Sequence, residues 1–154
     1  MSVAFRRESD DEHKEPRFEL PIPPGPNLVT ARGLAQIEAR MAEFEALVAS
    51  ESDAERREAA RRDLRYWTAR RASAQIVPPP SVGAVAFGSR VTFVQDGRER
   101  VIEIVGGDEA DPANGRIAFF APLARALMEA AVGDHLDFAG RADAIEILAI
   151  ESRA

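Results

Sequence analysis

Acidic side chains are the groups in this sequence best placed to do chemistry, and they gather in two short stretches. The first stretch lies between two helical patterns, and the second follows a pair of glycines. Carboxylates at such places either bind a cation or a basic partner, or serve the chain itself by capping a helix or shaping a turn. The acidic residues are Glu51, Asp53 and Glu55 in the first stretch and Asp108, Glu109 and Asp111 in the second.

The other chemistry-bearing residues form no catalytic motif. His13 and His135 stand far apart in unlike contexts, and the chain has no cysteine. Metalloprotease, P-loop, dinucleotide and nucleophile-elbow patterns are all missing. The sequence therefore predicts an accessory protein, not an enzyme, with no cofactor of its own.

Composition narrows the class of protein. The chain has 154 residues and a formal net charge of −6. This acidic balance argues against binding duplex phosphates as the main activity. No apolar run approaches the ~20 residues that a membrane helix needs, and the first residues have no secretory signal. We expect a cytoplasmic protein that binds no membrane.

Proline marks two segments that cannot be helical. Four prolines between residues 21 and 26 predict an extended tail over residues 1–28, partly polyproline II. Three more prolines predict a semi-rigid linker over residues 76–83. Between them, residues 29–75 have the pattern of an antiparallel helical hairpin, a coiled coil of two arms.

Capping signals delimit the two arms. Thr30 is suited to cap the first helix, which should end near Ala49. Ser52 and Glu55 have capping-box spacing for the second helix. Each arm of about 20 residues would be roughly 30 Å long at helical rise.

Each arm also carries an apolar seam of the kind that pairs helices. We expect Tyr66 and Trp67 to pack toward the second domain or toward the tail and so to stabilise the base of the hairpin. The seam residues are Leu34, Ile37, Met41, Phe44 and Leu47 or Val48 in the first arm, and Ala60, Leu64, Trp67, Arg71 and Ala74 in the second.

From Phe87 onward the apolar period changes from helical to alternating, which indicates strands. Asp96-Gly97 is a strong hairpin signal, and Asn114-Gly115 supplies another turn. Pro122 opens a single helix that should reach about Ala131 and turn Ala124, Leu127 and Met128 toward the sheet. The predicted fold class is α+β: a helical hairpin followed, over residues 84–154, by a small antiparallel sheet with one helix.

An ordered series of short motifs in this half resembles the C-terminal domain of the bacterial Gre transcript-cleavage factors, the GreA/GreB family. The motifs are VAFGSRV at 85–91, VGGDEADP at 105–112, APLARALM at 121–128, VGD at 132–134 and IEIL at 145–148. Residues 28–40 and 70–77 resemble the two ends of the hairpin that precedes this domain in the family. The resemblance implies an FKBP-like fold for residues 84–154.

The resemblance also implies a partner. In that family the hairpin enters the secondary channel of RNA polymerase, where tip acids help hold the second Mg²⁺ of the polymerase active site. It therefore implies RNA polymerase core as the partner, nucleic acid contacted only within that complex, and Mg²⁺ shared with the polymerase as the only metal. By our alignment about 20 hairpin residues are missing here, which shortens the reach by roughly 13 Å.

Two interpretations of Glu51, Asp53 and Glu55 at the shortened tip stay open. In one, they replace the family's tip acids and RNA cleavage survives. In the other, they cap and stabilise the helix start. A deficit of roughly 13 Å is large against metal–oxygen distances near 2 Å, so we favour a monomeric factor that regulates elongation without full stimulation of cleavage.

The family's contact loops for the channel rim correspond here to Asp108, Glu109, Asp111, Pro112 and Pro122. Acids there would pair with basic rim side chains and Pro122 would give an apolar contact; alternatively, residues 108–112 only shape a turn. Two residues depart from the family pattern: Ala121 replaces a usual serine and Glu129 a usual glycine. An alternative of another class, an FKBP-like peptide-binding protein or isomerase, rests on analogy of fold.

Overall fold

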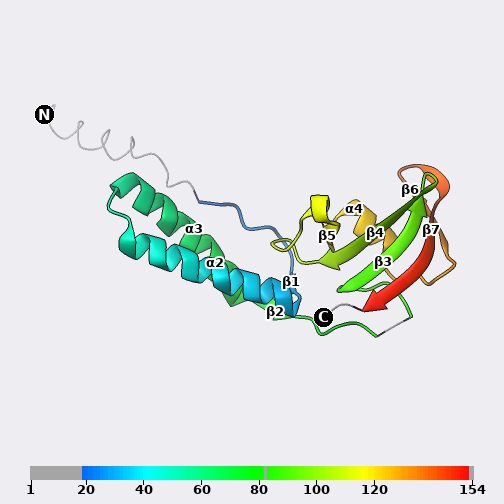
Figure 1. The fold of residues 1–154 in the computed structure, drawn as a ribbon, viewed down its shortest axis with the longest axis horizontal. Helices are drawn as coiled ribbons and strands as arrows, with labels where there is room; N and C mark the ends of the chain where they lie inside the picture. The colour runs from blue at the N-terminus through cyan, green and yellow to red at the C-terminus, as the bar shows by residue number, and fades with distance from the viewer. Residues whose placement is uncertain (1–18, 82, 153–154) are drawn as a thin grey trace, which may run out of the picture.

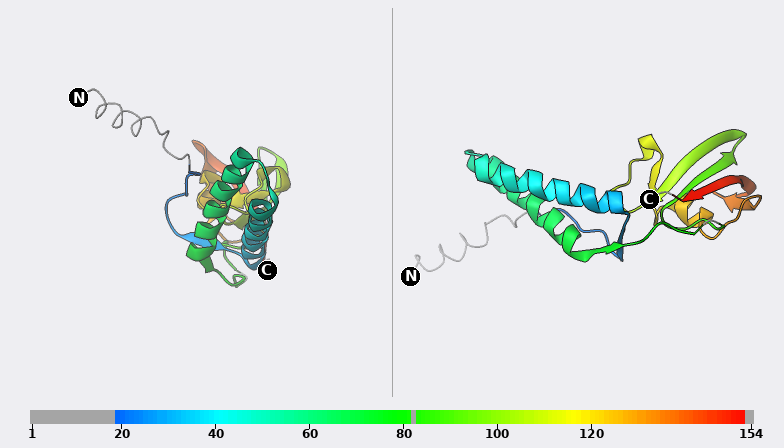
Figure 2. Two further views of the ribbon diagram at one scale, coloured as in Figure 1. Left: turned by 90° about the vertical axis from the view of Figure 1, so that its left-hand side faces the viewer. Right: turned by 60° about the horizontal axis from the view of Figure 1, so that its bottom comes forward.

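The computed structural model describes residues 19–81 and 83–152 and consists of a helical rod joined to a sheet-containing body (Figure 1). The rod's two helices lie side by side and project away from the body, as Figure 1 and the right-hand view of Figure 2 show. This arrangement confirms the predicted α+β class. The elements in chain order are β1 (Asn27–Val29), α2 (Ala31–Ser50), α3 (Ala54–Ser73), β2 (Ala74–Ile76), β3 (Ser89–Gln95), β4 (Arg98–Val105), the 3-10 helix η1 (Pro112–Asn114), β5 (Arg116–Ala118), α4 (Pro122–Leu127), β6 (His135–Phe138) and β7 (Arg141–Ser152).

Helix α2 begins where the capping signal predicts. The Thr30 side chain accepts a hydrogen bond from the backbone N–H of Gly33 at 2.9 Å, which satisfies one of the free donors of the first turn. The helix ends at Ser50, one residue beyond the expected end.

The cap of α3 differs from the prediction. Asp53, not Ser52, is the N-cap residue, and its carboxylate accepts from the N–H of Arg56 at 2.9 Å. The helix begins at Ala54, so Ser52 stands one residue too early to reach the free donors of the first turn. The capping-box interpretation of Ser52 and Glu55 was therefore wrong.

The two arms share only a thin core. Ile37 of α2 and Ala60 of α3 are buried, whereas Leu47 near the tip remains 39% exposed. Arg71, expected in the seam, is exposed and pairs across the arms with Glu38 at 3.0 Å. Because two helices without a third layer cannot enclose a full apolar stripe, most seam residues stay half-buried.

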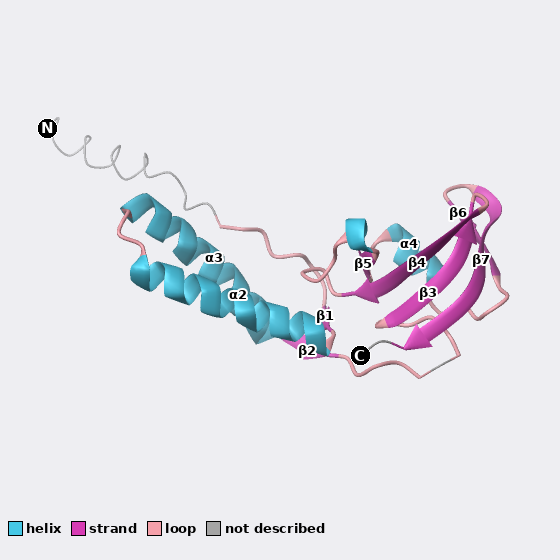
Figure 3. Cartoon of the chain, in the orientation of Figure 1, coloured by secondary structure: helices cyan, strands magenta, loops and turns pink. Residues whose placement is uncertain are grey.

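A parallel strand pair closes the base of the hairpin. Asn27–Val29 (β1) pairs with Ala74–Ile76 (β2), so the residues on both sides of the two expected hairpin boundaries are hydrogen-bonded strands (Figure 3). Ala74, expected in the helical seam, begins β2 instead. Residues 19–26 have no regular structure, and residues 1–18 of the expected tail lie outside the described residues. The pair ties the start of α2 to the end of α3.

The body contains a five-stranded sheet of order β5-β4-β3-β7-β6. The Asp96-Gly97 turn between β3 and β4 is confirmed, with both residues at positive φ as a two-residue hairpin requires. All neighbours are antiparallel except β4 and β5, which pair in parallel. This detail departs from an all-antiparallel sheet because residues 106–115 carry the chain back before β5 begins.

Helix α4 is shorter than predicted and ends at Leu127 instead of near Ala131. Glu129 has a φ of +67°, which no right-handed helix accepts. Its N–H donates to the carbonyl of Val85 at 2.8 Å, and the N–H of Val85 donates to the carbonyl of Ala130 at 2.8 Å. These extended contacts replace the last helical turn.

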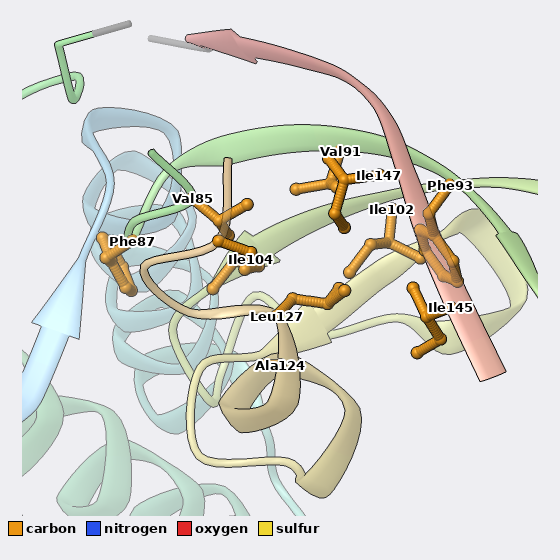
Figure 4. Packing of buried hydrophobic residues seen from close by; sticks show 11 residues of the cluster. Val85, Phe87, Val91, Phe93, Ile102, Ile104, Ala124, Leu127, Ile145 and Ile147 are labelled. Carbon is orange, nitrogen blue, oxygen red and sulfur yellow. The ribbon is translucent and has the colours of Figure 1, made fainter. Parts of the chain in front are cut away.

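The core of the body lies between α4 and one face of the sheet (Figure 4). Ala124 and Leu127 of α4 are fully buried, as predicted, and Met128 packs against the same cluster partly buried. No helix within the described ranges is both long and apolar enough to cross a membrane. The buried cluster comprises Val85, Phe87, Val91, Phe93, Ile102, Ile104, Ala124, Leu127, Ala130, Ile145 and Ile147.

Candidate functional site

The three tip acids lie together at the far end of the rod, and two of them serve the backbone. A carboxylate oxygen of Glu51 accepts from the N–H of Asp53 at 3.1 Å, and Asp53 caps α3 through Arg56. Glu55 lies in the first turn of α3, where a negative charge favours the helix dipole. In the part of the chain that the structure describes, no group of three or more acidic, histidine or cysteine side chains could hold a metal ion.

Asp108 faces the hairpin. One of its carboxylate oxygens accepts from the Tyr66 hydroxyl at 2.5 Å, and the other accepts from the Arg70 Nε at 2.6 Å. Arg70 is 4% exposed and also donates to the Asn27 side chain at 2.8 Å. Asp108 therefore binds the base of α3 through a largely buried ion pair.

Glu109 makes the equivalent contact with α2. Its carboxylate accepts from the Thr30 hydroxyl at 2.5 Å and from the Arg32 Nε at 2.6 Å. Arg32 also donates to Glu103 of β4 at 2.8 Å. The Glu109 side chain is 1% exposed, so this carboxylate has no open surface for a partner protein.

These two contacts show what Asp108 and Glu109 bind within the chain. Asp108 and Glu109 stand among the residues that the family resemblance implies for binding polymerase, but their oxygens are occupied within the chain. The alternative that residues 108–112 only shape a turn is also too simple, because these acids join two parts of the fold. Tyr66 does pack toward the body, as the sequence predicts.

Two side chains at this junction, Tyr66 and Arg32, have raised pKa values. Burial, followed by the hydrogen bond to Asp108, raises the pKa of Tyr66 to about 12. Hydrogen bonds to Glu103 and then Glu109 raise the pKa of Arg32 above its usual value. Both groups therefore stay protonated, and they stay hydrogen-bond donors across the physiological range.

The remaining contact candidates are accessible. Pro112 and Pro122 are exposed, and Asp111 is half-buried and accepts from the Asn114 side chain at 2.6 Å. Phe120, which the sequence analysis did not single out, is 43% exposed next to Pro122. Apolar side chains left exposed beside polar ones are common at protein-binding surfaces.

A cleft of about 550 Å³ opens in the elbow between α2 and the loop that contains Asp111. The indole of Trp67 contributes an aromatic wall and packs edge-on against Tyr66, with ring centroids 5.0 Å apart. Both acidic and basic side chains line it. The lining residues include Arg40, Glu43, Asp111 and Arg116.

Sequence analysis missed the hairpin partners of the two acids. They are Thr30 and Arg32 on α2, and Arg70 with Tyr66 on α3. One signal was present: Tyr66 and Arg70 are four residues apart and so share a helix face at the base. The arginine-rich composition of α3 obscured which of its basic side chains is buried.

The fold and this junction define a class of protein in which a small β-rich body presents a projecting helical hairpin. Residues 79–152 match the family model described as transcription elongation factor GreA/GreB, C-terminal domain. The match covers just under half of the chain and identifies residues 79–152 as a GreA/GreB C-terminal domain.

Named relatives agree with that assignment. The chain is 40% identical over 96 residues to transcription elongation factor GreB of Neisseria meningitidis serogroup A, covering 58% of this chain and 59% of the relative. It is 41% identical over 71 residues to GreA of Sinorhizobium medicae, covering 44% of this chain and 45% of the relative. The chain thus matches about half the length of these curated relatives.

Two solved structures cover most of the chain at low similarity. The GreA factor homolog Gfh1 of Thermus thermophilus covers 82% of this chain and 99% of that one, with 19% identity and a TM-score of 0.38. A GreA/GreB factor of Nitrosomonas europaea covers 82% and 98%, with 19% identity and a TM-score of 0.40.

Proposed function

We propose that this protein is a transcription elongation factor that binds RNA polymerase core at its secondary channel. The hairpin occupies the channel and the body rests on its rim, so the protein regulates elongation in the bacterial cytoplasm as an accessory factor. The observation that carries this proposal is a projecting two-helix rod on a GreA/GreB C-terminal domain.

The contact with the rim is assigned to the accessible residues of the body. Pro112, Phe120 and Pro122 offer exposed apolar surface, and Asp111 lines the elbow cleft and offers a carboxylate to a basic side chain. Asp108 and Glu109 are left out of this contact, because binding a partner would require breaking their buried internal pairs.

The same factor is proposed to lack full stimulation of transcript cleavage. Activating water for phosphodiester hydrolysis requires carboxylate oxygens at about 2 Å from a metal. Glu51 and Asp53 use oxygens to bind backbone N–H groups at the turn. Any Mg²⁺ in the complex would belong to the polymerase site, while Asp53 caps α3, Glu51 binds the turn and Glu55 favours the helix dipole.

Binding is tested first with purified core enzyme at low salt. We expect a complex, together with competition against a cleavage-competent GreB for the same site. No complex under these conditions would refute the proposal and leave the FKBP-like peptide-binding alternative as the next hypothesis.

Cleavage is tested on a backtracked elongation complex with Mg²⁺. We expect the protein to add little to the intrinsic rate and to slow cleavage stimulated by GreB. The triple variant Glu51→Ala, Asp53→Ala, Glu55→Ala should compete as the unchanged protein does. A control carries the same loss of three acids away from the tip, at the exposed positions Glu99, Glu146 and Glu151 of the body. Strong cleavage that disappears only in the tip variant would establish the alternative, a cleavage-competent factor.

A further inference from the structure

Two adjacent acids hold the two arms of the hairpin separately. Asp108 binds α3 through Tyr66 and Arg70, and Glu109 binds α2 through Thr30 and Arg32. We propose that Asp108 and Glu109 form an acid clasp that fixes the direction of the hairpin relative to the body. They are positioning residues, and this role rests on the proposed function, in which the hairpin must point into a channel.

Burial makes the clasp resistant to opening. The side chains of Arg70 and Asp108 are 5% and 11% exposed, and that of Glu109 is 1% exposed. Separating such a pair leaves a charge in a poorly solvated place, which is far less favourable than separating an exposed pair. The exposed Glu38–Arg71 pair on the rod has no comparable cost.

Beside the clasp, the body and the hairpin also pack closely against each other. A Cβ added to Gly106 would lie 2.3 Å from the carbonyl oxygen of Leu28 in β1, and one added to Gly33 would lie 2.8 Å from a Glu109 oxygen. Body and hairpin therefore approach each other at backbone distance directly beside the two acids. Only glycine permits this approach.

The strand pair at the base makes the two arms move together. β1 precedes α2 and β2 follows α3, and their parallel hydrogen bonds join the two ends. A rod tied in this way can change direction only as a unit. The direction of the rod then depends on both acids, because a single contact would let the rod rotate about it.

The test measures the hairpin's direction without polymerase, so its outcome is independent of whether the proposed function holds. The chain has no cysteine, so Ser52→Cys at the tip and Arg98→Cys on the body, both exposed, accept one spin label each. Pulsed electron–electron resonance then gives the distribution of tip-to-body distances. We expect one narrow distribution in the labelled protein and a broadened or shifted one in Asp108→Asn, Glu109→Gln.

A matched control separates the clasp from a general effect of the loop. Asp111→Asn changes an acid in the same loop whose carboxylate bonds only locally to Asn114, and it should leave the distance distribution unchanged. Helix content and the cooperativity of unfolding, followed by circular dichroism, should stay alike in all variants. An unchanged distribution in the double variant would overturn the proposal.

A milder variant keeps the test decisive where the double variant does not fold. Tyr66→Phe with Arg32→Gln removes one donor from each acid, together with the pair between Arg32 and Glu103, and keeps both carboxylates. It should broaden the distribution less than the double variant. An unbroadened distribution in this folded protein would likewise overturn the clasp.

Discussion

At the scale of single residues, the hydroxyl of Tyr66 reports directly on the junction between hairpin and body. It is the only tyrosine in the chain, so the ultraviolet absorbance of its phenolate follows one group. Burial and the Asp108 hydrogen bond raise its pKa to about 12, against an ordinary 10.0. We predict an ionisation midpoint well above 10, and a midpoint near 10 in the folded protein would contradict the geometry.

The same shift fixes the sign of a pH effect on stability. A raised pKa means that folding favours the neutral phenol, so this contribution is complete below the ordinary value of 10.0 and is lost as pH rises through about 12. In Asp108→Asn the midpoint should fall toward the ordinary value but stay above it, because burial is the larger cause. Circular dichroism at each pH shows that the titration precedes unfolding.

Glu129 has a left-handed backbone conformation that is unfavourable for a residue other than glycine. Its φ of +67° is left-handed, which costs a non-glycine residue roughly 1–2 kcal/mol. We predict that Glu129→Gly stabilises the protein by about 1 kcal/mol, less than the full strain because glycine is freer in the unfolded chain. Urea unfolding measures the change. Glu99→Gly, at an exposed position in β4, is the control and should destabilise.

At the scale of elements, the approach of the 106–111 loop to β1 requires glycine at one position and not at the next. A Cβ on Gly106 would meet the Leu28 carbonyl oxygen at 2.3 Å, whereas one on Gly107 would meet the ring of Phe120 at 3.2 Å. Phe120 is 43% exposed, so its ring can shift by a few tenths of an ångström more easily than the hydrogen-bonded backbone of β1. We predict that Gly106→Ala destabilises by about 1–3 kcal/mol, as overpacking does.

Gly107→Ala is the neighbouring control and should cost under about 1 kcal/mol, within the range of tolerated changes. Thermal unfolding of both variants measures the difference. If the two alanines cost the same, the close approach of Leu28 would not be what selects glycine at 106.

The elements could be predicted from sequence wherever the signal is local. The Thr30 cap, the Asp96-Gly97 turn and the buried positions Ala124 and Leu127 each follow from neighbours within a few residues. The early end of α4 could not, since it depends on Val85, which lies over 40 residues away in the chain and binds Glu129.

The candidate site was predictable only in part for the same reason. The sequence located both acidic stretches, and it left open whether the tip acids were caps. The family resemblance implied an external partner for Asp108 and Glu109, because they lie where the family has its contact loops. Within the chain these acids bind Arg70 and Arg32, 38 and 77 residues away, and nothing local distinguishes these arginines from the others.

At the scale of the whole molecule, stability should be uneven along the rod. The buried residues of α2 are Gly33 and Ile37, both in its first half, and α3 contributes Ala60 and Arg70. Near the tip, Leu47 is 39% exposed, and the Arg40–Glu43 and Arg61–Glu58 pairs farther along the rod are exposed as well. Exposed ion pairs contribute only about 0–1 kcal/mol each, so little holds the distal turns except the helices themselves.

We therefore predict a gradient of amide hydrogen exchange along the hairpin. Peptides covering residues 45–57 should exchange fastest among the helical ones, those at the base near Ile37 and Arg70 more slowly, and the strands that carry Val91 and Ile147 slowest. In Asp108→Asn, Glu109→Gln, exchange at the base should accelerate while the tip stays as it was, because the clasp acts only at the base. Uniform protection along both arms, or acceleration at the tip alone, would show that the rod is stabilised by something other than its attachment to the body.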